Sequence, residues 1–299
     1  MCIRDSGWRV ADLRTTSSVT GPTTTPVLFA DDYGFHTGNT WYRGHFTVGA
    51  SHDAPTGLKL RVVSGGRGGA FSVWLNGTFL GSVSRIEEGA FGFPQAALRR
   101  GDNVVSVLTV DMGHEEDLES RSENRTARGI IAAETLGQGA GSITWRIQGV
   151  ITGADPVRGP YNLGGLFGER QGWPSRPGNS GWTPAALPAG TRQPGVTWYR
   201  TGVTLDLPRK QDTSVGLEIK DPTMRHYRAT IFVNGWHMGN YIAELGPQNS
   251  FPIPNGVLNV HGHNEIAIAV WKTDNSAGGL GAVSLVTYGS PVSPELPAG

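Results

Sequence analysis

The strongest constraint on the fold of this chain is an internal repeat. The tetrapeptide Thr-Trp-Tyr-Arg occurs at 40–43 and again at 197–200. An apolar run that ends in Asn-Gly occurs at 71–77 and again at 230–235. The matched segments keep their order at a nearly constant offset, and such a long period indicates two copies of one structural unit.

Each copy carries the patterns of β-strands. Apolar and basic residues alternate over 58–62, the period of two that a half-buried strand shows. The segments 104–110 and 266–271 are nearly continuous apolar runs, as expected for strands that lie between packed layers. The 44 glycines and 19 prolines interrupt the chain too often for long helices. The chain is therefore expected to be all-β.

The turns support the same fold class. Asn-Gly at 76–77 and at 234–235 stands between apolar runs, and this pair favours the type I′ turn of a β-hairpin because both central residues need positive φ. Short strands joined by such turns predict two tandem jelly-roll β-sandwiches. We place the first in residues 1–152, and the second, with a linker strap before it, in residues 153–299.

Two segments lack a regular pattern. Residues 153–196 are rich in Gly and Pro and contain Tyr161, Phe167 and Trp173. A long irregular segment with aromatic residues is expected to be functional or to be strapped across a domain surface. Residues 112–129 are rich in charged side chains, and we expect a solvated surface loop there.

Charge and composition exclude several classes of protein. Lys plus Arg and Asp plus Glu both number 25, so no basic surface is available to bind nucleic acid or an anionic membrane. No apolar run approaches the length of a bilayer span, and the first six residues lack the apolar core of a signal peptide. The single cysteine, Cys2, allows neither an internal disulfide nor a cysteine-rich metal site. No cofactor and no metal are expected.

Several short motifs follow one another in a fixed order. They are Asp-Tyr-Gly-Phe-His-Thr-Gly at 32–38, Arg-Gly-His-Phe at 43–46, Asp-Met-Gly-His at 111–114, Ala-Arg-Gly-Ile at 127–130, Trp-Arg-Ile-Gln-Gly at 145–149, Arg-Gly at 158–159, Gly-Gly-Leu at 164–166 and Glu-Arg-Gln-Gly-Trp at 169–173. In these motifs the chain resembles the C-terminal half of the large β-galactosidases of glycoside hydrolase family 35. The resemblance covers nearly the whole chain.

The resemblance implies a non-catalytic role. In that family a (β/α)-barrel carries both catalytic glutamates, and this sequence shows no alternation of strands with amphipathic helices that would build a barrel. No residue here is therefore predicted to be catalytic. The resemblance implies two galactose-binding-domain-like jelly rolls that pack around the barrel of an extracellular enzyme, separated here from it. The alternatives are a stand-alone carbohydrate-binding module, with galactosides as ligands, and an interaction domain without a sugar role.

Candidate sites for other chemistry are weak. The acidic pairs at 31–32, 87–88 and 115–116 are adjacent residues, which point to opposite faces of a strand, so none is a natural pair to flank one glycosidic bond. His261 and His263 have the spacing of metal ligands, but the repeat places them in a turn. The glycine-rich tract at 65–69 lacks the Lys and Ser/Thr of a phosphate loop and is expected to connect strands.

Sugar binding is a more specific hypothesis than metal or phosphate binding. Trp236, His237 and Tyr241 follow the second hairpin turn, and they are the candidate carbohydrate-binding residues, with packing as the alternative. Asn76 and Asn124 each begin an N-glycosylation sequon. Asn76 belongs to the hairpin turn, so Asn124 is the candidate for an accessible glycosylation site.

Overall fold

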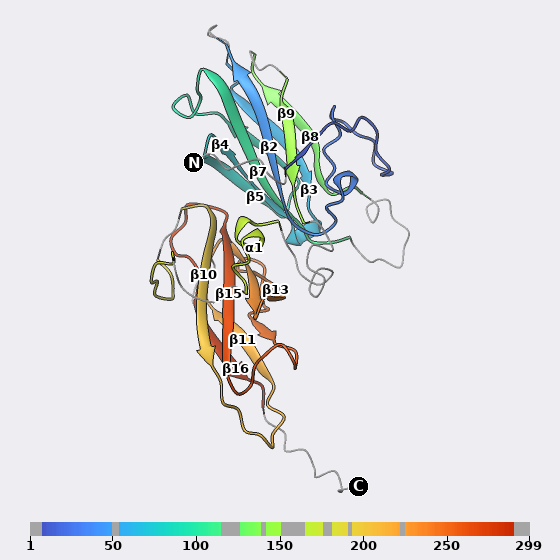
Figure 1. The fold of residues 1–299 in the computed structure, drawn as a ribbon. Helices are drawn as coiled ribbons and strands as arrows, with labels where there is room; N and C mark the ends of the chain where they lie inside the picture. Colours follow the sequence, from blue (N-terminus) through green and yellow to red (C-terminus); the bar gives the residue numbers. More distant parts are fainter. Residues whose placement is uncertain are drawn as a thin grey trace. The chain divides into compact units, whose positions relative to one another are not determined.

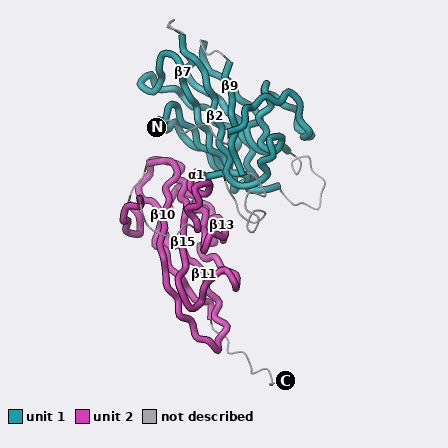
Figure 2. The backbone as a smooth tube through the Cα atoms, in the orientation of Figure 1, with its two compact units in different colours: residues 1–166 teal, residues 167–299 magenta. Residues whose placement is uncertain are grey.

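A computed structural model gives the protein as two compact units, residues 1–166 and 167–299 (Figures 1 and 2). The predicted boundary between residues 152 and 153 falls within residues 151–164, which lie outside the described part of the chain. The structure describes residues 8–49, 54–114, 126–138, 142–150, 165–175, 181–190, 193–221 and 225–289.

Unit 1 is a sandwich of two antiparallel sheets. Its larger sheet has the strand order β1-β9-β2-β7-β4-β5, and its smaller sheet has the order β6-β3-β8. Two 3-10 turns, η1 (Asp31–Tyr33) and η2 (Gly66–Gly68), precede β2 and β4. The strands are β1 (Arg9–Val10), β2 (Gly38–Val48), β3 (Gly57–Val63), β4 (Ala70–Leu75), β5 (Thr78–Ser84), β6 (Glu88–Gly92), β7 (Gly101–Asp111), β8 (Gly129–Leu136) and β9 (Thr144–Gln148).

Unit 2 has the same construction with fewer strands. Its larger sheet has the order β10-β15-β12-β13 and its smaller sheet the order β14-β11-β16. A single helical turn, α1 (Phe167–Arg170), precedes the first strand. The strands are β10 (Gly195–Thr204), β11 (Val215–Lys220), β12 (Tyr227–Val233), β13 (Trp236–Ile242), β14 (Ser250–Pro252), β15 (His263–Lys272) and β16 (Ala282–Thr287).

The strand orders explain the sequence repeat. The order β2-β7-β4-β5 of unit 1 corresponds strand by strand to β10-β15-β12-β13 of unit 2, and β6-β3-β8 corresponds to β14-β11-β16. The repeated apolar runs are the central strands β7 and β15, each hydrogen-bonded to a neighbour on both sides. The predicted all-β fold is confirmed.

Each sandwich encloses its own core. On β3, Leu58, Leu60 and Val62 are fully buried, while the alternating Lys59 and Arg61 point to solvent. This is the period-two pattern that the sequence predicts. The core of unit 1 adds residues from β2, β4 and β7, and a separate core fills unit 2 from β11, β12 and β15.

Both hairpin turns have the predicted geometry. Asn76 and Gly77 have φ of 50° and 87°, and Asn234 and Gly235 have φ of 48° and 81°. Positive φ at both central residues defines the type I′ turn, which matches the twist of the flanking strands.

A pair of asparagines, of which the one on the central strand is fully buried, connects each hairpin to the start of that strand. In unit 2, the Asn234 amide nitrogen donates to Oδ1 of Asn264 over 2.8 Å and to the carbonyl of Val257 over 2.7 Å. Asn264 is fully buried, and its own amide nitrogen donates to the carbonyls of Asn259 and Gly262.

The same pair occurs in unit 1. Asn76 donates to Oδ1 of Asn103 over 2.8 Å and to the carbonyl of Ala97 over 2.8 Å. Asn103 is fully buried and donates to the carbonyls of Arg99 and Gly101. We call each pair, Asn76–Asn103 and Asn234–Asn264, an asparagine lock.

The predicted solvated loop at 112–129 is wrong at its C-terminal end. Arg128 is 3% exposed, and its guanidinium donates to the carbonyl oxygens of Gly113 and Thr126. Its backbone N–H donates to the Asp31 carboxylate over 2.8 Å. The buried guanidinium is tolerated because these carbonyls satisfy its donors. Residues 115–125 of this segment lie outside the described residues.

Candidate functional site

The outer face of the larger sheet in unit 2 carries a row of aromatic side chains. Trp198 of β10 stacks on Phe232 of β12 with ring centroids 5.8 Å apart, and Phe232 meets His237 of β13 edge-on at 5.8 Å. Successive residues of a strand point to opposite faces, so Tyr199 and Ile231 pack in the core while their neighbours face outward. We call Trp198, Phe232 and His237 the aromatic face.

Small residues on the central strand make this stacking possible. β15 lies between β10 and β12, and it places Ala269 opposite Trp198 and Ala267 opposite Phe232. Strands on either side of a central strand are about 9–10 Å apart, so the two rings must lean over the strand between them to touch. Alanine side chains leave the space that the rings occupy.

We call the described residues before β10, 167–175 and 181–190, the strap, because the first of these two ranges lies across the aromatic face. Trp173 meets Trp198 at right angles, with ring centroids 5.7 Å apart. Phe167 and Trp182 contact Trp173 in turn, at 5.6 Å and 5.4 Å. The expectation of a strap across a domain surface agrees with these contacts.

Gly168 lets the strap approach this closely. A Cβ atom at this position would lie 2.3 Å from a Trp173 ring carbon and 2.4 Å from a Trp198 ring carbon. The backbone of α1 therefore rests directly on the indole rings, and any larger residue would push the strap away from the sheet.

Charged groups on the same outer face are paired. Arg200 lies 2.8 Å from the Glu265 carboxylate, and its side chain is 2% exposed. Arg228 lies 3.7 Å from Glu244, and its guanidinium sits 6.0 Å above the Trp271 ring. A buried guanidinium needs such a partner, so these pairs are parts of the covered surface.

Unit 1 repeats the aromatic face at equivalent positions. Trp41 of β2 lies 5.6 Å from Trp74 of β4, which lies 5.7 Å from Phe79 of β5. The Arg43 guanidinium stacks 4.6 Å above the Trp8 ring. The repeated Thr-Trp-Tyr-Arg motif therefore codes for alternation, with Tyr in the core and Trp and Arg on the outer face. The motif was the available signal for Trp198, which the sequence analysis did not select as a site residue.

The structure separates the three predicted sugar-binding residues. Trp236 starts β13 opposite Val233, next to the hairpin turn. His237 belongs to the aromatic face. Tyr241 is 6% exposed in the core, and its hydroxyl donates to the Asp221 carboxylate over 2.9 Å. Sugar binding by these residues stays a prediction, and the three do not form one platform.

A β-bulge explains the separation. Residues 237 and 241 are four apart and would share a face in a regular strand. The register of β12 and β13 shifts between Ile231 and Phe232, so the strand turns over between the two positions. Gly239 has φ of +151° there, and a Cβ would lie 2.8 Å from the Phe251 ring, so glycine is required.

Burial of His237 predicts that unit 2 loses stability in mild acid. Burial lowers the pKa of this imidazole below its ordinary value, against a weaker opposing effect of the Asn240 side chain. As the pH falls, the imidazole therefore takes up its proton at a higher pH in the unfolded chain than in the folded one. The contribution of neutral His237 to the free energy of unfolding is complete above the unfolded pKa of about 6.5 and is lost as the pH falls below that value. We expect His237→Phe, which copies Phe79 of unit 1, to remove this loss. Urea unfolding of both proteins at neutral and at mildly acidic pH measures the loss. Every other titratable group is the same in the two proteins, so the difference between their losses belongs to His237. Equal loss in both proteins would contradict the assignment.

The acidic pair at 31–32 has structural partners. Asp31 accepts the Arg128 backbone N–H, and its carboxylate lies 3.2 Å from Nδ1 of His36. Asp32 accepts hydrogen bonds from the backbone N–H and the hydroxyl of Ser17. Neither contact positions the two carboxylates across a shared substrate.

The glutamates at 87–88 form ion pairs on the surface of the smaller sheet of unit 1. Glu87 lies 3.0 Å from Arg61, and Glu88 lies 3.6 Å from Lys59. The two glutamates therefore pair with neighbouring basic residues on β3, and exposed pairs of this kind contribute little to stability. The pair at 115–116 lies outside the described residues.

His261 lies in the predicted turn, whereas His263 is the first residue of β15, and each histidine pairs with a carboxylate. His261 Nδ1 lies 2.9 Å from Asp206, and His263 Nε2 lies 3.0 Å from Glu265. Within the described ranges, no group of three or more potential metal ligands is assembled. The tract at 65–69 contains η2 and connects β3 to β4, as expected for a strand connection.

The two sequons differ in what the structure shows. The Asn76 amide nitrogen donates both of its hydrogens within the asparagine lock, so it cannot carry a glycan while the hairpin is formed. Asn124 lies outside the described residues, and glycosylation there stays a prediction.

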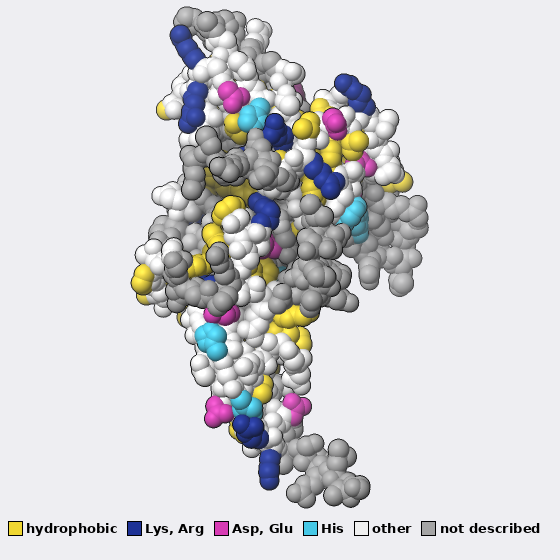
Figure 3. Space-filling view, in the orientation of Figure 1, with side chains coloured by type: hydrophobic (Ala, Val, Ile, Leu, Met, Phe, Trp, Pro, Cys, Tyr) yellow, Lys and Arg dark blue, Asp and Glu magenta, His cyan; other side chains and the backbone are white. Residues whose placement is uncertain are grey.

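Charges of both signs lie on the described part of the face that Figure 3 shows. Figure 3 shows Lys and Arg side chains interspersed with Asp and Glu on the face in view, in keeping with the balanced composition. None of the helices in the described ranges has the length and apolar character that a membrane span requires.

The fold and its contacts define a class of protein, a tandem pair of β-sandwiches with aromatic outer faces. A family model described as the β-galactosidase second all-beta domain matches residues 4–115 and 167–276, one segment in each unit. The chain belongs to this family.

Curated relatives give the same result. The chain is 36% identical to the probable β-galactosidase A of Aspergillus fumigatus, over 98% of this chain and 30% of that protein. It is 37% identical to the probable β-galactosidase C of Aspergillus niger, over 96% of this chain and 30% of that protein. The chain thus spans about a third of the length of these relatives, and the predicted resemblance to their C-terminal part is confirmed.

Solved structures add little. A family 78 rhamnosidase of Bacillus sp. GL1 aligns over 88% of this chain and 33% of that chain, at 15% identity and a TM-score of 0.30. A similarity at this level carries no argument.

Proposed function

We propose that this chain is the non-catalytic C-terminal part of a β-galactosidase that hydrolyses terminal non-reducing β-D-galactosyl residues with retention. The observation that carries the proposal is the 36% identity to fungal β-galactosidases over 98% of the chain. The role of the two sandwiches is to pack against the catalytic barrel and stabilise it.

Exposed apolar residues of the strap support packing against another domain. Phe167, at the outer end of the aromatic row, is 51% exposed, and Leu187 is 38% exposed. Exposed apolar groups beside a rigid aromatic cluster are typical of interaction surfaces. A partner domain that covers them would bury surface that the chain alone leaves in water.

Retaining hydrolysis needs two carboxyl groups about 5–5.5 Å apart across the bond. The described acidic pairs at 31–32 and 87–88 are instead engaged with neighbouring polar or basic groups. We therefore expect the purified chain to release no aglycone from a chromogenic β-galactoside above the buffer background. Turnover that co-purifies with the chain would contradict the proposal.

Packing is tested with the catalytic part of the same enzyme expressed separately. We expect the two parts to co-purify, and the activity of the catalytic part to survive heating better when the chain is present. Phe167→Ser should weaken the complex, while Ile86→Ser, an exposed residue outside the strap, should leave it unchanged. Failure to associate, with both parts folded, would overturn the packing role.

The alternative function is a carbohydrate-binding module. Its support is the position of Trp236 beside the hairpin turn, with His237 adjacent. Titration of galactose against tryptophan fluorescence separates the two functions. Saturable quenching by a monomeric chain, lost in Trp236→Ala, would favour the binding module over packing.

A further inference from the structure

The chain contains three Asn-Gly dipeptides, at 76–77, 234–235 and 255–256. In such a pair, the backbone nitrogen of Gly can attack the side-chain amide carbon of Asn, because glycine offers no side chain to hinder the approach. The reaction requires that the asparagine side chain can rotate toward that nitrogen. The three asparagines differ in how many hydrogen bonds hold their side chains.

Two of the asparagines are held in the asparagine locks. Asn76 accepts the Val104 backbone N–H at Oδ1 over 2.9 Å while its nitrogen makes two hydrogen bonds. Asn234 likewise accepts the Glu265 N–H over 2.8 Å and donates twice. Rotation of either side chain breaks three hydrogen bonds. One joins it to the fully buried asparagine, one to the backbone of the next residue on the central strand, and one to a loop carbonyl.

Asn255 has no such restraint. It lies at an exposed turn in which the Val257 N–H donates to the Pro254 carbonyl over 3.2 Å. Gly256 is exposed, has φ of +88°, and has no atom within 4 Å of the position of a Cβ. Within the described residues, neither the Asn255 side chain nor the Gly256 N–H has a hydrogen-bond partner.

We propose that Asn255 is the site of preferential spontaneous deamidation in this protein. The Gly256 nitrogen forms a bond to Cγ of Asn255, loses its proton, and ammonia leaves, which gives a succinimide. Water then opens the ring at either carbonyl carbon, which gives aspartate or isoaspartate at position 255.

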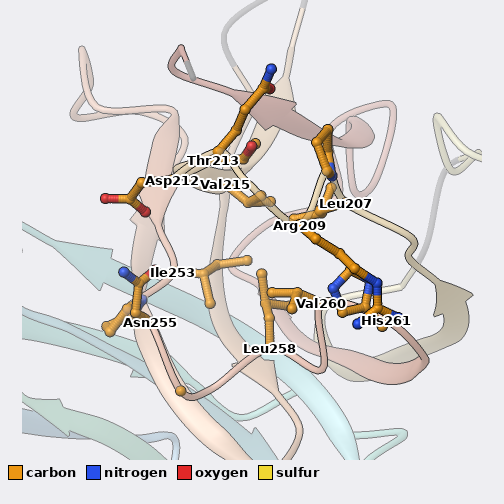
Figure 4. A pocket seen from close by; sticks show the side chains of 14 residues that line it. Leu207, Arg209, Asp212, Thr213, Val215, Ile253, Asn255, Leu258, Val260 and His261 are labelled. Atoms are coloured by element: carbon orange, nitrogen blue, oxygen red, sulfur yellow. The ribbon is translucent and has the colours of Figure 1, made fainter. Parts of the chain in front are cut away.

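The modification changes a cleft at one end of unit 2. This cleft has a volume of about 400 Å³. Figure 4 shows Asn255 and Asp212 on one side of it and Arg209 and His261 on the other. Apolar residues also line it, among them Leu207, Val215, Ile253, Leu258 and Val260. Deamidation adds a carboxylate to the side that already carries Asp212.

Isoaspartate at position 255 also disturbs the asparagine lock of unit 2. The 254–257 turn positions the Val257 carbonyl, which accepts a hydrogen bond from Asn234. Isoaspartate adds a methylene to the backbone within this turn, so the carbonyl is displaced from its donor. We therefore expect isoaspartate at 255 to lower the stability of unit 2.

Unit 1 supplies the matched control. Its equivalent turn contains Gln95 and Ala96, with the Ala97 N–H donating to the Pro94 carbonyl over 2.9 Å. Glutamine would have to form a larger ring and reacts far more slowly. Asn255→Gln therefore introduces the residue that unit 1 carries at the equivalent position.

The test is incubation of the full chain in mildly alkaline buffer, followed by peptide mapping by mass spectrometry and detection of isoaspartate. We expect the peptide with Asn255 to gain the mass that replacement of –NH2 by –OH gives, while those with Asn76 and Asn234 stay unchanged. In urea, all three should convert. Equal conversion of the three in the folded chain, or no conversion at 255 while the urea sample converts, would overturn the proposal.

Thermal unfolding provides a second readout. The incubated protein should lose stability in unit 2 as isoaspartate accumulates, and Asn255→Gln should keep its initial unfolding temperature. An equal loss of thermal stability in Asn255→Gln would show that incubation damages unit 2 at another residue.

Discussion

Asn264→Ala is expected to lower the free energy of unfolding of unit 2 by about 2–4 kcal/mol, because it removes four hydrogen bonds made by a fully buried side chain. Asn264 accepts from the Asn259 N–H and the Asn234 amide, and it donates to the carbonyls of Asn259 and Gly262. The loss is measured by chemical denaturation, with fragments from pulse proteolysis assigning each transition to its unit.

Two matched variants show whether the hydrogen bonds cause the effect. Asn264→Asp keeps the size of the side chain but replaces the donor to the Asn259 and Gly262 carbonyls by an acceptor, so we expect a loss at least as large. Asn103→Ala should destabilise unit 1 by a similar amount and leave the transition of unit 2 in place. If Asn264→Asp were as stable as the native chain, the lock would be unimportant.

The asparagine locks show what the sequence could predict and what it could not. The repeat aligned the segment that ends at Asn103 with the one that ends at Asn264, and the Asn-Gly pairs predicted the turns with their positive φ. The bond between the hairpin asparagine and the buried asparagine joins residues about 30 positions apart. No local pattern encodes such a contact, because it depends on the order of strands in the sheet.

The face of each side chain was predictable where strands are regular. Alternation on β3 predicted the buried Leu58, Leu60 and Val62, and the structure agrees. On β13 regular alternation does not hold, because the bulge beside Gly239 reverses it after His237 and places Tyr241 in the core. A glycine inside a strand pattern was the available sign of a bulge.

Charge was a poor guide to exposure in the segment 112–129. Arg128 is buried although the segment as a whole is rich in charged residues, since the carbonyls of Gly113 and Thr126 satisfy its donors. These partners come from the two ends of one loop, which the sequence shows as a single charged stretch. Composition describes a segment as a whole and does not identify the one residue that anchors it.

The aromatic face gives the other large expected effect. Trp198→Ala should lower the free energy of unfolding of unit 2 by about 3 kcal/mol, near the low end for loss of a large aromatic side chain because Trp198 is only partly buried. It removes the ring that joins Phe232 below to Trp173 above, at 5.8 Å and 5.7 Å. The strap should then detach, and trypsin should cleave after Arg170 of α1 much faster than in the native chain. Mass spectrometry of the early fragments locates the cut.

Trp41→Ala is the matched control, because Trp41 occupies the equivalent position in unit 1 and contacts Trp74 at 5.6 Å. It should destabilise unit 1 while cleavage after Arg170 stays slow. Trp198→Phe should restore part of the protection, since a smaller ring can still contact Phe232. If both Trp198 variants were cleaved at the native rate while unit 2 lost stability, the ring would stabilise the sheet without holding the strap. Protection lost in Trp198→Ala and partly recovered in Trp198→Phe would show that the strap is held by ring contacts, which is what the close approach at Gly168 requires.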